Sequence, residues 1–118
     1  MTKRGDVVLA RFPYVGGAGS KNRPAVVVKC DRLNGKIRNT VLAMITGNLR
    51  LVSTEPTQFL IDPGTPDGAS SGLTQPSAVK CENLMTVAQV KVFRRIGELS
   101  ASAMRQIEAK VTLALELP

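Results

Sequence analysis

The sequence predicts a mainly β domain, in which several short strands form a small barrel-like sheet that one C-terminal α-helix caps. Short runs of β-branched and apolar residues alternate with turns rich in Gly, Pro, Asn and Asp as far as Val87. A single helical pattern of apolar residues follows Ser100. With 118 residues, of which 43% are hydrophobic, the chain is long enough to bury one core and too short for two. One domain spanning residues 1–118 is therefore expected.

The first two strands are expected to form a hairpin around a glycine-rich loop. Asp6 to Phe12 (DVVLARF) is rich in strand-forming residues. The segment Tyr14 to Asn22 holds three glycines and predicts a loop, after which Ala25 to Lys29 resumes a strand. Pro24 restricts Arg23 to an extended conformation, so the guanidinium is held where the loop becomes a strand.

The middle of the chain predicts three more strands. The pair Asn34-Gly35 suits a tight hairpin turn, from which Ile37 to Thr46 returns as a third strand. A short strand at Phe59 to Ile61 precedes an irregular stretch, Asp62 to Gly72, which is dense in Pro, Gly, Ser and Asp. Ser77 to Val87, interrupted by polar side chains, predicts a further strand.

A helix is expected to begin directly after Ser100. The serine is a favourable N-cap, and Leu99 before it can pack against Met104 as a hydrophobic staple. Apolar residues then recur at helical spacing, at Met104, Ile107, Val111, Ala114 and Leu115. This stripe indicates a helix that covers an open face of the sheet.

Composition favours a polyanionic partner. The chain has 16 Lys and Arg against 9 Asp and Glu, a net charge of +7, although lysines scattered over a solvated surface give the same sum.

Two cysteines and no histidine exclude an ordinary Cys/His zinc site and any His-dependent nucleophile, so neither metal nor cofactor is expected. Cys30 and Cys81 are expected to be reduced core thiols. No apolar run approaches the length of a membrane span, which predicts a cytoplasmic protein with no membrane partner.

Six polar residues, at strand ends and in the first loop, suit the binding of a phosphodiester. They are Arg23, Thr46, Lys80 and Glu82, with Ser20 and Lys21 in the loop. Arginine offers a planar fork that matches phosphate oxygens, and threonine adds a hydroxyl to the same group. Structural roles are the alternative: Arg23 pairing with Glu82 or Asp62, Thr46 closing a turn, and Lys80 and Glu82 facing outward from a half-buried strand.

Four blocks of the sequence, in the same order, resemble the MazF/PemK family of toxins from type II toxin-antitoxin systems. They are Lys3–Val8 (KRGDVV), Gly19–Val27 (GSKNRPAVV), Ala43–Thr46 (AMIT) and Arg95–Ser100 (RIGELS), the last resembling the approach to the family's final helix. The segment Leu73–Leu84 is similar to the PemK-like branch in particular.

The resemblance implies an SH3-like barrel of the CcdB/PemK type that forms a homodimer and cleaves single-stranded RNA without a metal. The RNA 2'-hydroxyl attacks its own phosphate and leaves a 2',3'-cyclic phosphate and a 5'-hydroxyl. A cognate acidic antitoxin is expected to lie over the RNA groove. Arg23 matches the family's catalytic arginine and Thr46 its catalytic threonine. Lys80 and Glu82 match an Arg-x-Asp pair that acts on the scissile phosphate in some members.

From this resemblance, Arg23, Thr46 and Glu82 are the expected catalytic residues, with Glu82 as the base. Ser20, Lys21 and Lys80 are expected to bind substrate. Many members carry a glutamate five residues before the arginine, where this chain has Ala18. Proton transfer is therefore expected to be shared by Arg23 and Glu82.

Two other functions fit the same sequence. One is a non-catalytic member of the fold that inhibits a protein target such as DNA gyrase. The other is a basic nucleic-acid-binding module without activity, although plain electrostatic binding does not require Arg23 and Thr46 at matching strand ends. Aromatic residues make up only 3% of the chain, so base stacking is expected to be limited, with Tyr14 of the loop as the aromatic that meets a base.

Overall fold

A computed structural model of the chain describes residues 2–13 and 20–118. The described residues form six β-strands, two α-helices and one 3-10 helix. In chain order the elements are β1 (Asp6–Pro13), β2 (Ser20–Val27), α1 (Asp31–Asn34), β3 (Asn39–Thr46), β4 (Gln58–Ile61), β5 (Ser77–Ala88), η1 (Gln89–Lys91), β6 (Val92–Glu98) and α2 (Ala101–Ala114).

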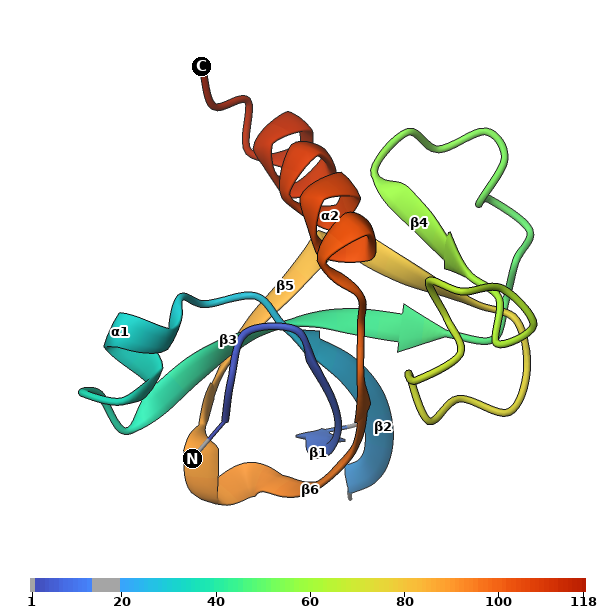
Figure 1. The fold of residues 1–118 in the computed structure, drawn as a ribbon. Helices are drawn as coiled ribbons and strands as arrows, with labels where there is room; N and C mark the ends of the chain where they lie inside the picture. The colour runs from blue at the N-terminus through green and yellow to red at the C-terminus, as the bar shows by residue number, and fades with distance from the viewer. Residues whose placement is uncertain (1, 14–19) are drawn as a thin grey trace.

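The strands form one antiparallel sheet in the order β4-β5-β3-β2-β1-β6. Figure 1 shows this sheet curling strongly, with β1, β2, β3 and β6 wrapped around one side. The helix α2 packs against β5 and β4 on the other side. Within the described residues the order has two ends, β4 and β6, so the sheet is barrel-like but open. A mainly β fold with a C-terminal helix is confirmed.

Alternating residues of the strands supply two separate hydrophobic cores, because neighbouring side chains of a strand point to opposite faces of a sheet. The α2-side core lies between the sheet and the helix and contains Val7, Val26, Ala43, Ile45, Phe59, Ile61, Val79, Cys81, Leu99, Ala103, Met104 and Ile107. The inner core lies on the opposite face and contains Val8, Ala10, Ala25, Val27, Leu42 and Val87.

The helix α2 begins as its sequence predicts. Ser100 is the N-cap, and its Oγ accepts a hydrogen bond from the backbone N–H of Ala103 over 3.0 Å. Leu99 and Met104 are both buried in the α2-side core, as a hydrophobic staple requires. Leu115, expected at the end of the apolar stripe, lies past the last helical residue and is exposed. None of the described helices is long and apolar enough to cross a membrane.

The strand β2 is longer than expected and starts inside the predicted loop. Ser20 to Arg23 pair with β1, whereas Tyr14 to Gly19 lie outside the described residues. The prediction that this strand starts at Ala25 is therefore wrong, because the strand already runs from Ser20 and continues through Pro24. Proline has no backbone donor, and it is tolerated here because pairing with β3 begins only at Ala25.

The Asn34-Gly35 pair does not form the predicted tight hairpin turn. Asp31 to Asn34 form the short helix α1, and Gly35 follows with an ordinary negative φ of −78°. Asn34 is buried: its Nδ2 donates to the Lys29 carbonyl over 2.9 Å, and its Oδ1 accepts from the Thr40 hydroxyl over 2.6 Å. These contacts hold Asn34 in the structure as a core residue, and β3 starts at Asn39 instead of Ile37.

The segment Arg95 to Glu98 belongs to the strand β6, which pairs with β1 and leads directly into α2. The sequence pattern did not predict this strand, since three consecutive residues, Phe93, Arg94 and Arg95, are exposed and do not alternate with buried ones.

The expectation of a core thiol is wrong for Cys30, which is exposed because it lies at the start of α1 outside both cores. Cys81 is buried as expected.

Candidate functional site

Arg23 and Thr46 lie at the same edge of the curled sheet. Paired residues of β2 and β3 run from Val27 opposite Leu42 to Ala25 opposite Met44. Arg23 and Thr46 each lie two residues beyond the last of these pairs, past the point where β2 and β3 cease to pair. Alternation also puts both on one face, the face of the inner core, since Ala25 belongs to that core and Met44 packs against it.

Lys80 joins them on this face from the next strand. Its register partners are Met44 in β3 and Gln58 in β4. Its neighbours Val79 and Cys81 point into the α2-side core, so Lys80 points away from α2. The three cationic and hydroxyl side chains expected at the site therefore share one face of three adjacent strands.

A small cavity lies beside Thr46 and Lys80, and Arg23 does not line it. It has a volume of about 60 Å³ and is lined by Thr46, Asn48, Leu51, Gln58 and Lys80. The Thr46 Oγ1 accepts a hydrogen bond from the backbone N–H of Asn48 over 3.1 Å, so Thr46 does close a turn. The same hydroxyl keeps its own proton, which it can donate to a bound group.

Glu82 is connected to this cavity through Gln58. Its Oε2 accepts from Gln58 Nε2 over 2.9 Å, and its Oε1 lies 3.1 Å from the Thr57 hydroxyl oxygen. That hydroxyl also lies 2.8 Å from Oε2 of Glu55, and its single proton serves only one carboxylate at a time. The Glu82 side chain is exposed and does not line the cavity.

Thr57 also affects the charge state of Glu55. Its backbone N–H donates to Glu55 Oε2 over 3.0 Å, and this bond, with that from the hydroxyl, lowers the pKa of Glu55. Two carboxylates therefore flank one hydroxyl beside β4. In residues 2–13 and 20–118, no group of three or more acidic or cysteine side chains is placed to hold a metal ion.

Arg23 is exposed at its strand end. The ion pairs within the described residues join Arg4 to Glu108 and Arg95 to both Asp6 and Glu98. Arg23 takes part in none of these pairs, so the alternative pairings with Glu82 or Asp62 do not form among the described residues.

The other sequence-predicted residues are only partly placed. Ser20 and Lys21 belong to β2, where their backbones pair with Pro13 and Phe12. Tyr14 and Ala18 lie outside the described residues.

Gln58 lines the cavity but was not singled out from the sequence. The signal that identifies it is strand alternation: Phe59 and Ile61 point into the α2-side core, so Gln58 lies on the face of Lys80.

Cys81 is next to Glu82 in sequence but takes no part in the site. It is fully buried in the α2-side core. Burial, with a smaller effect of the nearby Glu82 charge, raises the pKa of the Cys81 thiol to about 12. It therefore remains a neutral thiol near pH 7 and is not available as a nucleophile.

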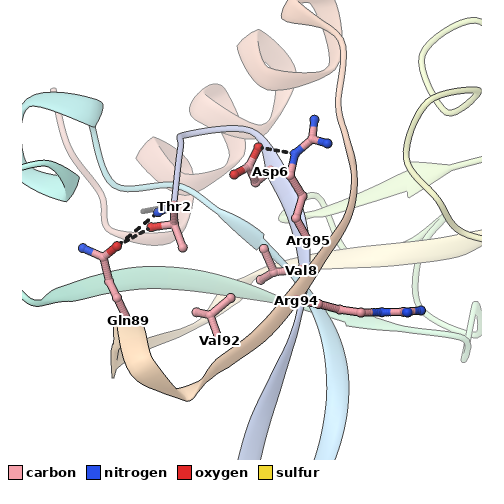
Figure 2. Close-up of a pocket in the computed structure, with 7 residues that line it drawn as sticks. All are labelled: Thr2, Asp6, Val8, Gln89, Val92, Arg94 and Arg95. Atoms are coloured by element: carbon pink, nitrogen blue, oxygen red, sulfur yellow. Dashed lines mark hydrogen bonds and ion pairs between the residues drawn. The ribbon is translucent and has the colours of Figure 1, made fainter.

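A larger cavity, of about 260 Å³, lies elsewhere, between the N-terminal segment and β6 (Figure 2). Apart from the exposed Arg94, its polar side chains are engaged within the protein. Asp6 accepts from Arg95 Nε over 3.0 Å and from the Lys3 backbone N–H over 2.9 Å. Gln89 accepts from the backbone N–H and hydroxyl of Thr2 and donates to two backbone carbonyls. This cavity is a structural junction.

Comparisons with known proteins show which family this chain resembles. The family model described as "PemK-like, MazF-like toxin of type II toxin-antitoxin system" matches residues 3–115. Endoribonuclease MazF9 of Mycobacterium tuberculosis is 26% identical over 121 residues, covering 99% of this chain and 98% of that protein. Endoribonuclease MazF3 of the same species is 30% identical over 97 residues, 82% of this chain and 85% of that protein.

Solved structures have the same fold. The Mycobacterium tuberculosis toxin MazF-mt6 superposes with a TM-score of 0.77 at 26% identity, covering 96% of this chain and 98% of its own. A mycobacterial endoribonuclease in complex with its cognate antitoxin superposes with a TM-score of 0.76 at 24% identity, covering 100% and 98%. Because the family model spans nearly the whole chain, this protein belongs to the PemK-like, MazF-like family of toxins from type II toxin-antitoxin systems.

Proposed function

We propose that this protein is the toxin of a type II toxin-antitoxin pair and acts as an endoribonuclease on single-stranded RNA in the cytoplasm. The observation that carries the proposal is that Arg23, Thr46 and Lys80 lie on the inner-core face of three adjacent strands. A cation and a hydroxyl donor held at adjacent strand ends suit a phosphodiester, and the net charge of +7 attracts RNA. Relatives named endoribonucleases support the same activity.

The proposed reaction needs only groups that the chain carries. The RNA 2'-oxygen forms a bond to the adjacent phosphorus, and the bond from phosphorus to the 5'-oxygen breaks. Glu82 takes the proton from the 2'-hydroxyl and later returns it to solvent, and the leaving 5'-oxygen takes a proton from solvent water to become a 5'-hydroxyl. Arg23 stabilises the charge that builds on the phosphoryl oxygens, and Thr46 donates its free hydroxyl proton to the same group.

The remaining proposed contacts hold the RNA backbone. Lys80, at the cavity, and Ser20 and Lys21, on β2, are the proposed substrate-binding residues. Phosphate contacts of this kind position RNA without reading its sequence.

Cleavage of an unstructured RNA in EDTA tests this proposal. The wild-type protein should cut it and leave 2',3'-cyclic phosphate ends, whereas Arg23→Ala should reduce the rate by about 10² to 10³ or more, as expected when a donor to the transition state is removed. Arg32→Ala, an exposed change on α1, is the matched control and should cut normally. Thermal unfolding should show that both variants are folded.

Other outcomes of this experiment would contradict the proposal in distinct ways. Cleavage by Arg23→Ala at the wild-type rate would refute the site. Intact RNA together with toxicity on expression would favour a protein target, and RNA binding without products would favour a binding module.

The proposed partners are a second copy of the chain and an acidic antitoxin. Val90 and Phe93, which are 91% and 66% exposed, provide apolar surface that a second copy can cover. Light scattering should give twice the 12.6 kDa chain mass, and a monomer at micromolar concentration would contradict the dimer. The antitoxin is expected to be a short acidic protein encoded beside the toxin, and its addition should stop cleavage.

A further inference from the structure

Gln58 holds a buried side-chain oxygen that has no hydrogen-bond partner. In the part of the chain that the structure describes, Gln58 Oε1 is the buried side-chain polar atom left unpaired. The residue itself is only 4% exposed. Gln89 shows the ordinary situation, since its oxygen accepts two hydrogen bonds and its nitrogen donates two. An unpaired buried acceptor costs stability, so its presence in the candidate site calls for a partner from outside the chain.

Glu82 fixes which end of the Gln58 amide is unpaired. Gln58 Nε2 donates to Glu82 Oε2 over 2.9 Å. A carboxylate only accepts hydrogen bonds, so rotating the amide would bring two acceptors together. The negative charge also polarises the amide and strengthens Oε1 as an acceptor. The group that completes the site must therefore be a donor.

The surroundings of the cavity narrow the identity of that donor. Lys80 and Thr46 line the same cavity, and both offer protons. A phosphate oxygen suits these two residues but would be repelled by Gln58 Oε1. A hydroxyl suits all three, because it donates to Oε1 and accepts from a neighbouring donor. The cavity of about 60 Å³ has roughly the volume of two water molecules, room for a hydroxyl and its adjoining atoms.

We propose that Gln58 binds the attacking 2'-hydroxyl of the RNA, whose proton it accepts in a hydrogen bond through Oε1. The hydroxyl is then held beside Thr46 and Lys80, which contact the adjacent phosphate. Gln58 orients the hydroxyl in the bound state and removes no proton from it; for the attack, the hydroxyl turns its single proton from Oε1 to Glu82, the proposed base. This inference rests on the proposed function, since only an RNA substrate supplies this hydroxyl next to a phosphate.

Access to Oε1 requires a small movement of the cavity lining. Leu51 is exposed and Lys80 half-buried, and the long Lys80 stem can move aside. The competing explanation is that Lys80, the register partner of Gln58, turns to donate to Oε1 within the protein. The experiment below separates these two possibilities, because only substrate recognition depends on the sugar.

The test measures the affinity of two RNA analogues that differ at one ribose. The ribose is the one on the 5' side of the scissile phosphate, identified from the wild-type cleavage products. One analogue carries 2'-deoxy at that ribose, with no donor, and the other carries 2'-amino, with an N–H donor that is not expected to support cleavage. The wild-type protein should bind the 2'-amino RNA about five- to tenfold more tightly, the usual effect of one hydrogen bond.

Gln58→Met, which keeps the side-chain length and removes the acceptor, should bind both analogues equally. Leu60→Met, an exposed position on the same face of β4, is the matched control and should keep the wild-type ratio. A 2'-fluoro analogue, which accepts and does not donate, should bind wild type like the deoxy form. This last measurement needs no variant and stands even if Gln58→Met does not fold.

The outcomes distinguish this inference from the proposed function. If the wild-type protein cleaves RNA but Gln58→Met keeps the preference for 2'-amino, or wild type shows none, the inference is overturned and the proposed function stands. Gln58 contacts a base instead if removing an amino group from a base weakens RNA binding by the wild-type protein but not by Gln58→Met, while the change at the ribose affects neither protein. If the wild-type protein cleaves no RNA, both fall together.

Discussion

Gly97 of β6 lies directly against the backbone of Ser71, so closely that a Cβ atom added at Gly97 would overlap the Ser71 carbonyl group. The backbone N–H of Glu98 also donates to the Ser70 carbonyl over 2.9 Å. The irregular segment before β5 is thus fixed to β6, an end strand of the sheet.

Gly97→Ala should therefore destabilise the protein, because the backbone of Ser71 has to move to admit a methyl group. We expect the free energy of unfolding to fall by about 2–3 kcal/mol, a typical cost of overpacking. Urea unfolding measures this change. Gly47→Ala is the control, since an added Cβ at Gly47 meets nothing within 4 Å. Equal unfolding midpoints for the two variants would show that the segment adapts freely.

Ser100→Ala should weaken the start of α2. The Ser100 Oγ accepts from the Ala103 N–H over 3.0 Å and donates to Asp67 Oδ1 over 2.6 Å. Loss of an N-cap side chain typically lowers the free energy of unfolding by about 0.5–2 kcal/mol. Ser102→Ala, an exposed substitution in the first turn of α2, should have little effect on the free energy of unfolding. A Ser100→Ala protein as stable as Ser102→Ala would mean that the cap contributes nothing.

The parts of the fold that local sequence signals determine were predictable. The cap at Ser100, the short strand at Phe59 to Ile61 and the long strand from Ser77 all form as their residues indicate. Asn34 failed as a turn signal because the hydrogen bonds of its buried side chain to Lys29 and Thr40 outweigh the preference of an Asn-Gly pair for a turn. The strand β6 was missed because pairing with β1, and not an apolar alternation, holds it in the sheet.

The candidate site was predictable only in part for a similar reason. Arg23 and Thr46 were identifiable as polar groups, and the alternation of β2 and β3 puts them on the same face of the sheet. Gln58 was not, because its importance comes from an unpaired oxygen, a property of three-dimensional packing that residue type does not reveal.

Stability should fall at alkaline pH because of Cys81. Burial raises the pKa of this thiol from 9.0 to about 12, so on raising the pH the unfolded chain loses the proton first. The unfolded state then binds fewer protons than the folded one, and the free energy of unfolding decreases between about pH 9 and pH 12. Below about pH 9 the thiol is neutral in both the folded and the unfolded state, so its contribution to the free energy of unfolding is fully present.

Urea unfolding of variants between pH 8 and pH 11 isolates this effect. Cys81→Ala should show a shallower loss of stability with pH than the wild type, whatever its stability at pH 8. Cys30→Ala should keep the wild-type slope, since Cys30 is exposed. Identical slopes for all three proteins would assign the alkaline loss to other groups.

Lys80 should contribute to RNA binding as a charge, and salt dependence measures charge directly. We expect Lys80→Met to weaken binding of an RNA made uncleavable by 2'-deoxy substitution at the cleaved ribose. Each phosphate contact to a single strand contributes about 0.7 to the slope of log K against log salt, so the slope of this variant should be smaller by about that amount. Lys36→Met, an exposed change near the opposite end of β3, should leave the slope unchanged. If the two variants give the same slope, Lys80 does not contact the RNA backbone, and its position beside Thr46 serves only the packing of the sheet.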